Sequence, residues 1–134
     1  MRHRILIGGS SRYPVDRARL RQALLAALAK ENLPQPVEIS LQIVGSRKMK
    51  QLNQQYRGKD YATNVLSFCL QEISGEQEEF VFPDNQTLYL GETVICYPVA
   101  RDEAGEYGMR VDDWIEQLAL HSLEHLLGRH HPGD

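Results

Sequence analysis

The sequence predicts an α+β fold, in which a mixed sheet of about four strands is flanked by helices and a central C-terminal helix carries candidate metal ligands. Segments in which apolar and polar residues alternate indicate strands, and segments with apolar residues three and four apart indicate helices. With 42% apolar and 25% charged residues, the composition is that of a globular protein and excludes a disordered chain. A length of 134 residues fits one domain, so residues 1–134 are expected to form a single unit.

The first half of the chain is expected to run strand, helix, strand, helix. Residues 4–7 form a short apolar strand that ends at two glycines. Asp16 can cap a helix that runs to about residue 32. Residues 37–43 place an apolar side chain at every second position, which is typical of a strand with one buried face. Ser46 can cap a short helix whose apolar stripe ends at Tyr56.

The second half is expected to contain further strands and two helices. Residues 65–70, 79–82 and 87–96 have the apolar and β-branched content of strands. Pro98 can open a helix at its first turn. The last helix, at about residues 111–127, is apolar around most of its second half and should therefore be central and buried. Gly128 stands where a left-handed residue would end this helix.

Several classes of protein are excluded by what the sequence lacks. No apolar run approaches the roughly 20 residues that span a bilayer, which argues against a membrane protein. The N-terminus has no apolar core of a signal peptide. Cys69 and Cys96 form no C-x-x-C pair, so a reduced, cytoplasmic chain is the simpler interpretation.

The net charge of −3 gives no overall attraction to nucleic acid, but the charge is unevenly distributed. Residues 47–59, called the basic segment below, contain five cations and no acidic residue: Arg47, Lys48, Lys50, Arg57 and Lys59. Acidic residues gather elsewhere, mainly in residues 72–84 and 102–116. The basic segment is either a local anion-binding surface or one solvated helix face.

Three histidines near the C-terminus have the spacing of a metal site. His121 and His125 lie four residues apart, about 40° apart around a helix, and so point the same way. His131 follows Gly128 and can supply a third ligand, a role that His130 could also fill or support. Three neutral imidazoles leave a divalent ion such as Zn²⁺ an open position, where it lowers the pKa of water to about 7 or polarises a phosphoryl or carbonyl oxygen. The alternative is that these are hydrogen-bonded core histidines.

The histidine spacing also matches the metzincin peptidase pattern H-E-x-x-H-x-x-G-x-x-H. A zinc peptidase needs a carboxylate directly after the first histidine to activate water, and Ser122 stands there. Glu124 lies on a neighbouring helical face and does not replace it. The sequence therefore argues against a metallopeptidase.

A second resemblance covers most of the chain. The residues from Leu52 onward resemble the YbeY family of bacterial metal-dependent endoribonucleases. Residues 52–68 are similar to its L-N-x-x-Y-R-x-K-D-x-x-T-D-V-L-S-F signature, residues 90–95 to its L-G-D-I-x-I strand, and residues 121–131 to its H-G-x-x-H-L-x-G-x-x-H motif. The chain departs from the family's usual residues at Asn64, Cys69, Glu92 and Ser122, and again at Arg129 and His130.

The resemblance implies an α+β fold and hydrolysis of single-stranded RNA, with a role in 16S ribosomal RNA 3′-end maturation and ribosome quality control. It also implies that His121, His125 and His131 hold one zinc or similar divalent ion. Arg57 matches the family's functional arginine, and a guanidinium can hold a phosphate by two parallel hydrogen bonds. The rest of the basic segment would then follow the RNA backbone. A non-catalytic, metal-stabilised factor that binds ribosomal RNA or the ribosome stays as the alternative.

Overall fold

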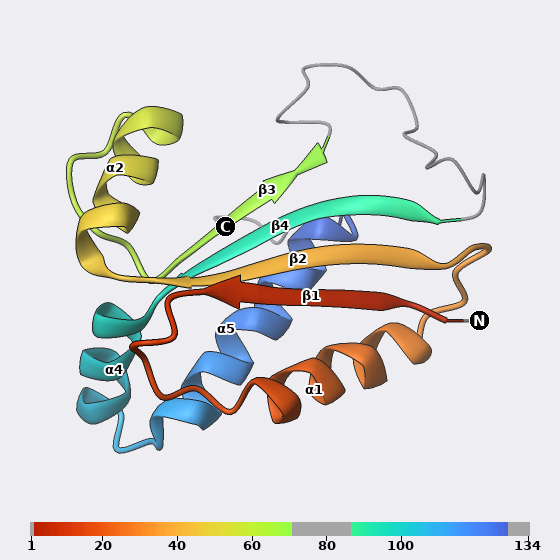
Figure 1. Cartoon of the computed structure of the whole chain (residues 1–134), viewed down its shortest axis with the longest axis horizontal. Coiled ribbons are helices and arrows are strands. Elements are labelled where there is room, and N and C mark those ends of the chain that lie inside the picture. Colours follow the sequence, from red (N-terminus) through yellow and green to blue (C-terminus); the bar gives the residue numbers. More distant parts are fainter. Residues whose placement is uncertain (1, 71–86, 129–134) are drawn as a thin grey trace.

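The computed structural model describes residues 2–70 and 87–128, which form a mixed sheet covered by helices (Figure 1). The strands are β1 (Arg4–Gly9), β2 (Val37–Val44), β3 (Val65–Cys69) and β4 (Leu88–Cys96). The helices are α1 (Arg17–Ala29), α2 (Ser46–Arg57), α4 (Tyr97–Glu106) and α5 (Val111–Leu126). The predicted α+β class is confirmed, and the strand expected at residues 79–82 lies outside the described residues.

The strand order in the sheet is β1-β2-β4-β3. The pairs β1–β2 and β2–β4 are parallel, and β3 pairs with β4 in the antiparallel direction. In that last pair Ser67 lies opposite Thr93, and Cys69 lies opposite Gly91. Within the described part of the chain, β3 is therefore an edge strand.

The two faces of the sheet carry two separate cores. The larger core contains the alternating residues Ile39, Leu41 and Ile43 of β2, together with buried side chains of α1 and α5. The smaller core lies on the opposite face, where Met49 of α2 packs with Leu66 of β3. Side chains alternate between the faces of a strand, so α2 and α5 cover opposite sides of the sheet. Figure 1 shows α5 crossing behind the strands, with α2 near one end of the sheet.

Most helix ends follow from local chemistry. The Asp16 carboxylate accepts a hydrogen bond from the Arg19 N–H at 3.1 Å, which confirms the predicted cap of α1. That helix ends at Ala29, earlier than expected. For α2 the cap prediction is wrong, because Gly45 is the cap residue and Ser46 is already helical. Gly128 follows α5 with a φ of 85°, the left-handed conformation that its position predicts.

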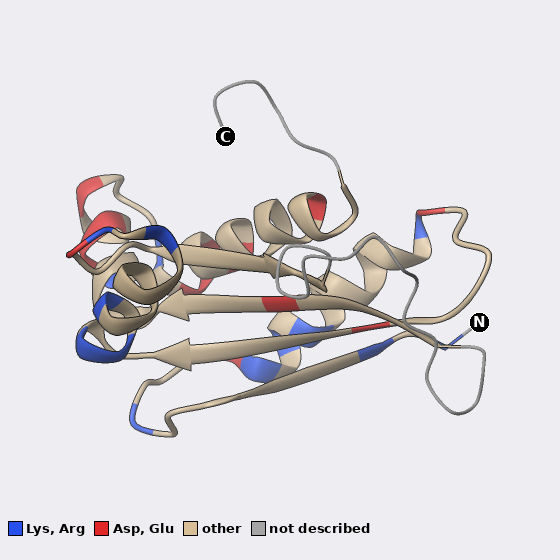
Figure 2. Ribbon diagram, turned by 90° about the horizontal axis from the view of Figure 1, so that it is seen from above, with Lys and Arg blue, Asp and Glu red and all other residues tan. Residues whose placement is uncertain are grey.

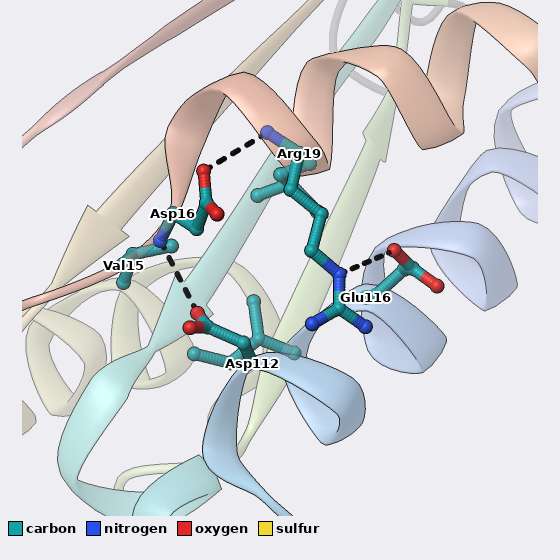
Figure 3. Close-up of a pocket in the computed structure, with 7 residues that line it drawn as sticks. Val15, Asp16, Arg19, Asp112 and Glu116 are labelled. Atoms are coloured by element: carbon teal, nitrogen blue, oxygen red, sulfur yellow. Dashed lines mark hydrogen bonds and ion pairs between the residues drawn. The ribbon is translucent and has the colours of Figure 1, made fainter.

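Charged side chains fasten the start of α5 to α1 (Figure 3). The Arg19 guanidinium donates to Asp113 at 2.5 Å and to Glu116 at 3.2 Å, and these bonds raise the pKa of Arg19 above its ordinary value. The backbone N–H of Asp16 donates to the Asp112 carboxylate at 3.2 Å. Since α5 carries the candidate ligands at its far end, these contacts help to fix its direction across the sheet. No helix in the described part of the chain is long and apolar enough to cross a membrane.

Candidate metal and RNA site

The last turns of α5 bring two imidazoles together. The Nε2 atoms of His121 and His125 are 3.2 Å apart, and the ring centroids are 4.8 Å apart with an interplanar angle of 78°. His121 is exposed and His125 is half-buried, although the helix around them packs into the core. The spacing of four residues thus brings the two rings together, as expected, and the pair lies at the edge of the core.

This geometry fits one metal ion held by both rings. Zinc–nitrogen distances of about 2.0–2.1 Å and a tetrahedral angle separate two ligand nitrogens by about 3.3–3.4 Å. The observed separation of 3.2 Å is close to that value. At the same distance one ring can donate its N–H to the other, so the two rings orient each other without a metal. The donor set, two imidazole nitrogens, suits zinc and similar divalent ions.

The other two candidate ligands lie near the C-terminus. His131, the predicted third ligand, and His130 both lie outside the described residues. Within residues 2–70 and 87–128, no cluster of three or more His, Cys, Asp or Glu side chains has the geometry to hold a metal. The prediction of a three-histidine site therefore stays a prediction, and the structure describes two of its members.

A cluster of hydroxyls holds the ligand-bearing turn of α5 against the sheet, and no sequence pattern predicts it directly. The Ser122 hydroxyl lies 2.6 Å from the Ser67 hydroxyl of β3 and 2.6 Å from the Thr93 hydroxyl of β4. Ser122 is fully buried and Thr93 is 1% exposed. Two residues further along β3, the Cys69 thiol donates to the backbone carbonyl of His125 at 3.4 Å. A serine in the apolar half of a helix was the only hint in the sequence.

The direction of Ser122 also bears on the peptidase alternative. The side chain at this position faces the sheet and is held there by both hydroxyl contacts. A metzincin would need its catalytic carboxylate at this position. The structure therefore shows a buried serine where a zinc peptidase has its general base.

The basic segment lies on α2 and the residue pair that follows it. Arg47, Lys48, Lys50, Arg57 and Lys59 are all exposed. Figure 2 shows blue segments gathered at the end of the sheet where α2 lies. Lys50 is 3.8 Å from the Asp60 carboxylate, a long and exposed ion pair. Among the described residues, no hydrogen bond or ion pair engages the Arg57 side chain, so its guanidinium is open to an anion.

The loop after α2 is fixed by one buried amide. Asn53 is 1% exposed, and its Nδ2 donates to the Tyr61 carbonyl at 2.9 Å. The backbone N–H of Lys59 donates to the Asn53 carbonyl at 3.2 Å, across the left-handed Gly58. Arg57 and Lys59 therefore stand on an ordered helix end and not on a loose loop.

Strand β3 connects the basic segment with the histidine pair. Tyr56, next to Arg57, meets the Phe68 ring edge to face with centroids 5.0 Å apart. Ser67 precedes Phe68 in β3, and its hydroxyl contacts the hydroxyl of Ser122, the residue next to His121. The two groups of candidate residues thus lie on opposite faces of the sheet with the edge strand β3 between them. No contact in the described part of the chain joins Arg57 directly to either histidine.

The start of β3 is tied to α4 and α5 by one carboxylate. Nδ2 of Asn64 donates to both Glu103 oxygens at 3.1 and 3.3 Å, and the Trp114 indole N–H donates to the same carboxylate at 3.0 Å. An asparagine can donate here, whereas an aspartate would set two carboxylates face to face. Asn64 is one of the departures from the family signature, and its environment suits an amide.

Comparison with known proteins places this arrangement in a family. The family model described as Endoribonuclease YbeY matches residues 12–134. Relatives named Endoribonuclease YbeY include one from Bacillus licheniformis, 37% identical over 91% of this chain and 77% of the relative. Another, from Moorella thermoacetica, is 38% identical over 89% of this chain and 78% of the relative. A solution structure from Thermotoga maritima has a TM-score of 0.61 at 26% identity, and it covers 91% of this chain and 71% of that one.

Proposed function

Because the chain belongs to the endoribonuclease YbeY family, a family of hydrolases that act on RNA, we propose that it is a metal-dependent enzyme which cuts single-stranded RNA. We further propose that its substrate is ribosomal RNA, that it acts in 16S 3′-end maturation and ribosome quality control, and that it works in the cytoplasm. In this proposal residues 1–134 act as one domain.

The observation that carries the metal part of the proposal is the separation of 3.2 Å between the Nε2 atoms of His121 and His125. We assign these two residues and His131 as the ligands of one zinc or similar divalent ion. Such an ion supplies Lewis-acid polarisation of a phosphoryl oxygen and activation of water. The protein contributes two rings that α5 holds in a fixed mutual orientation, so little rearrangement is needed for binding.

The basic segment supplies the phosphate contacts. Arg47, Lys48, Lys50 and Lys59 are exposed cations on or directly after α2, suited to neutralise successive phosphates. Arg57 has the additional geometry of a planar fork, which can hold one phosphate by two hydrogen bonds and stabilise charge that develops on it. In the proposed reaction Arg57 is the catalytic arginine, and the four other cations position the strand.

The edge position of β3 accounts for how one RNA strand meets both groups. The basic segment and the histidine pair lie on opposite faces, and among the described strands β3 is the one that lies between them at this edge of the sheet. A flexible single strand bound along α2 can pass over this edge to the histidines, whereas a stiff duplex cannot bend so sharply. This arrangement supports the preference for single-stranded RNA.

Metal content tests the ligand assignment. We expect wild-type protein purified without chelators to contain about one equivalent of zinc or another divalent ion by elemental analysis, and we expect His121→Ala and His131→Ala to contain far less. Each loss removes one of three ligands and leaves the others unable to complete the site. Arg101→Ala, a change of an exposed arginine on α4, is the matched control and should keep the metal. Equal metal content in all four proteins would overturn the assignment.

Cleavage of a labelled single-stranded RNA tests the activity and the role of Arg57. We expect Arg57→Ala to keep its metal but to cut about 10²-fold more slowly, the usual cost of removing one donor to a developing negative charge. His125→Ala should lose both metal and activity, and Arg101→Ala should resemble wild type. Casein is included as a peptidase substrate and should stay intact.

The alternatives predict different results in the same assay. If the wild type binds RNA tightly but its weak cleavage equals that of Arg57→Ala and His125→Ala, the cleavage is contamination and the chain is a binding factor. Cleavage of casein that disappears in His125→Ala would instead indicate a peptidase. A duplex of the same RNA should be cut poorly by the wild type.

A further inference from the structure

Ser122 has an unusual environment for a serine inside a helix. Such a hydroxyl ordinarily faces solvent or bonds back to the carbonyl four residues earlier. Here it is fully buried and contacts two hydroxyls of the sheet, Ser67 and Thr93, each at 2.6 Å. Those two partners lie opposite each other in the β3–β4 ladder. One hydroxyl of α5 is thus bonded to both strands at the same level.

The position of this contact along α5 connects it to the histidine pair. Ser122 follows His121 directly and precedes His125 by three residues, so it lies about 100° and 60° from them around the helix axis. A helix fixed at Ser122 can neither rotate nor slide at the turn from which both imidazoles project. The hydroxyl contacts therefore act on the placement of the rings through the backbone, without touching them.

Two further contacts fix the same stretch of helix. The Cys69 thiol donates to the backbone carbonyl of His125 at 3.4 Å. A Cβ built on Gly91 would lie 3.1 Å from Cδ2 of Leu126, so the missing side chain lets the end of α5 approach β4 closely. The serine contacts are the central ones of this series, since they alone reach both strands.

Resting on the proposed function, we propose that Ser122 is a positioning residue for the metal ligands. Its buried hydroxyl, held between Ser67 and Thr93, fixes the turn of α5 that carries His121 and His125 and so sets where their rings stand relative to the sheet. Three hydroxyls in a row satisfy one another as donors and acceptors, and hydrogen bonds in such a chain strengthen one another. His121 is exposed and His125 is half-buried, but the turn of α5 that carries both rings is held in place from inside the protein.

The sharpest test removes one hydroxyl without changing the shape of the core. Thr93→Val keeps the volume and loses only the hydroxyl, whereas Thr93→Ser keeps the hydroxyl and loses a methyl group. Zinc affinity is measured by competition with a chromophoric chelator, in the absence of RNA. We expect Thr93→Val and Ser122→Ala to bind zinc on the order of tenfold more weakly, as for other changes next to ligand residues, and Thr93→Ser to bind like wild type.

A control variant separates this role from general stability. Ser40→Ala removes another hydroxyl contact between strands, the bond of 3.2 Å from the Tyr89 hydroxyl, on β2 and β4 but away from α5. Its Tm is expected to fall while its zinc affinity stays unchanged. The absorption spectrum of bound Co²⁺ is a second readout, and it should change in Ser122→Ala and Thr93→Val but not in Ser40→Ala.

The outcomes distinguish this inference from the proposed function. If wild-type protein binds no zinc, the metal part of the proposed function fails, and the positioning role fails with it. If wild type binds zinc and both hydroxyl-deletion variants bind it equally well with an unchanged Co²⁺ spectrum, the proposed function stands and the positioning role of Ser122 is wrong. If Thr93→Ser weakens binding as much as Thr93→Val, packing and not the hydroxyl is responsible, which also overturns the inference.

Discussion

At the scale of single residues, His3 shows how a side chain near a chain end can contribute to the sheet. Its Nδ1 accepts a hydrogen bond from the Val37 N–H at 3.0 Å, which joins the start of β1 to the start of β2. Only the neutral ring can accept at Nδ1. Partial burial disfavours the charged ring and lowers the pKa of His3 below its ordinary value of 6.5.

The lowered pKa predicts a pH-dependent part of the stability. Because the folded pKa lies below the unfolded one, the contribution of His3 is fully present above about pH 6.5 and is lost as the pH falls through the folded value. We expect the free energy of unfolding of wild type to fall more between pH 7.5 and pH 5 than that of His3→Ala. Urea unfolding at several pH values measures both, and the other histidines contribute equally to the two proteins. Parallel pH profiles would show that the Val37 contact does not matter.

The candidate site residues differ in how far the sequence could predict them. His121 and His125 were predictable because a helix fixes the direction of side chains four residues apart, and both facts are local. The exposure of Arg57 follows likewise from the polar face of α2. The partners of Ser122 were not predictable, since they lie 55 and 29 residues away on two strands whose register the sequence does not specify. Tertiary packing decides which partner a polar residue in an apolar stripe contacts.

At the scale of elements, Gly91 determines how closely β3, β4 and α5 approach one another. Its φ of 145° is in a region that side chains disfavour. A Cβ at this position would lie 2.1 Å from the Phe68 carbonyl oxygen, which is far too close for two non-bonded atoms. It would also lie 3.1 Å from Cδ2 of Leu126 in α5. Opposite this part of β4, the register with β2 shifts between Glu38 and Ile39, which is the signature of a bulge. The glycine therefore allows both the backbone conformation of the bulge and the close packing of α5 against β4.

The element boundaries follow this division between local and tertiary causes. The caps at Asp16 and Gly128 and the alternation in β2 were predicted correctly, because each depends on neighbours in sequence. The cap of α2 was assigned one residue too late, since a glycine with extended backbone can precede a helix without any side-chain signal. The bulge at Gly91 had no signal beyond the glycine itself.

Gly91→Ala tests the close approach. We expect a loss of roughly 2–4 kcal/mol in the free energy of unfolding, because the strained φ and the clash with backbone of β3 add to each other. Gly105→Ala is the matched control: this glycine lies inside α4 with nothing within 4 Å of its Cβ position. The control should be neutral or gain up to about 1 kcal/mol from better helix propensity. Equal stability of the two variants, measured by thermal or urea unfolding, would mean that the bulge tolerates a side chain.

At the scale of the whole molecule, the charge distribution matters more than the net charge of −3. Acidic residues lie on α4 and on the start of α5, where Asp112, Asp113 and Glu116 are engaged with α1. The basic segment lies on α2, at the opposite face of the sheet from α5. A polyanion approaching α2 therefore meets five exposed cations, while the acidic start of α5 lies across the sheet. The proposed RNA surface is attractive although the molecule as a whole is not.

The salt dependence of RNA binding tests whether these five cations act together. For single strands the slope of log K against log salt is about −0.7 per phosphate neutralised, so five contacts give a slope of about −3.5. The measurement uses the catalytically inactive His125→Ala protein, so that the RNA stays intact. We expect adding Lys48→Gln to this protein to change the slope to about −2.8. Lys30→Gln is the matched control, because Lys30 is an equally exposed lysine at the end of α1 on the other face. Its slope should equal that of the background protein, which separates a local surface from the effect of net charge. If both lysine changes reduce the slope alike, the RNA responds to total charge and the basic segment is only a solvated helix face.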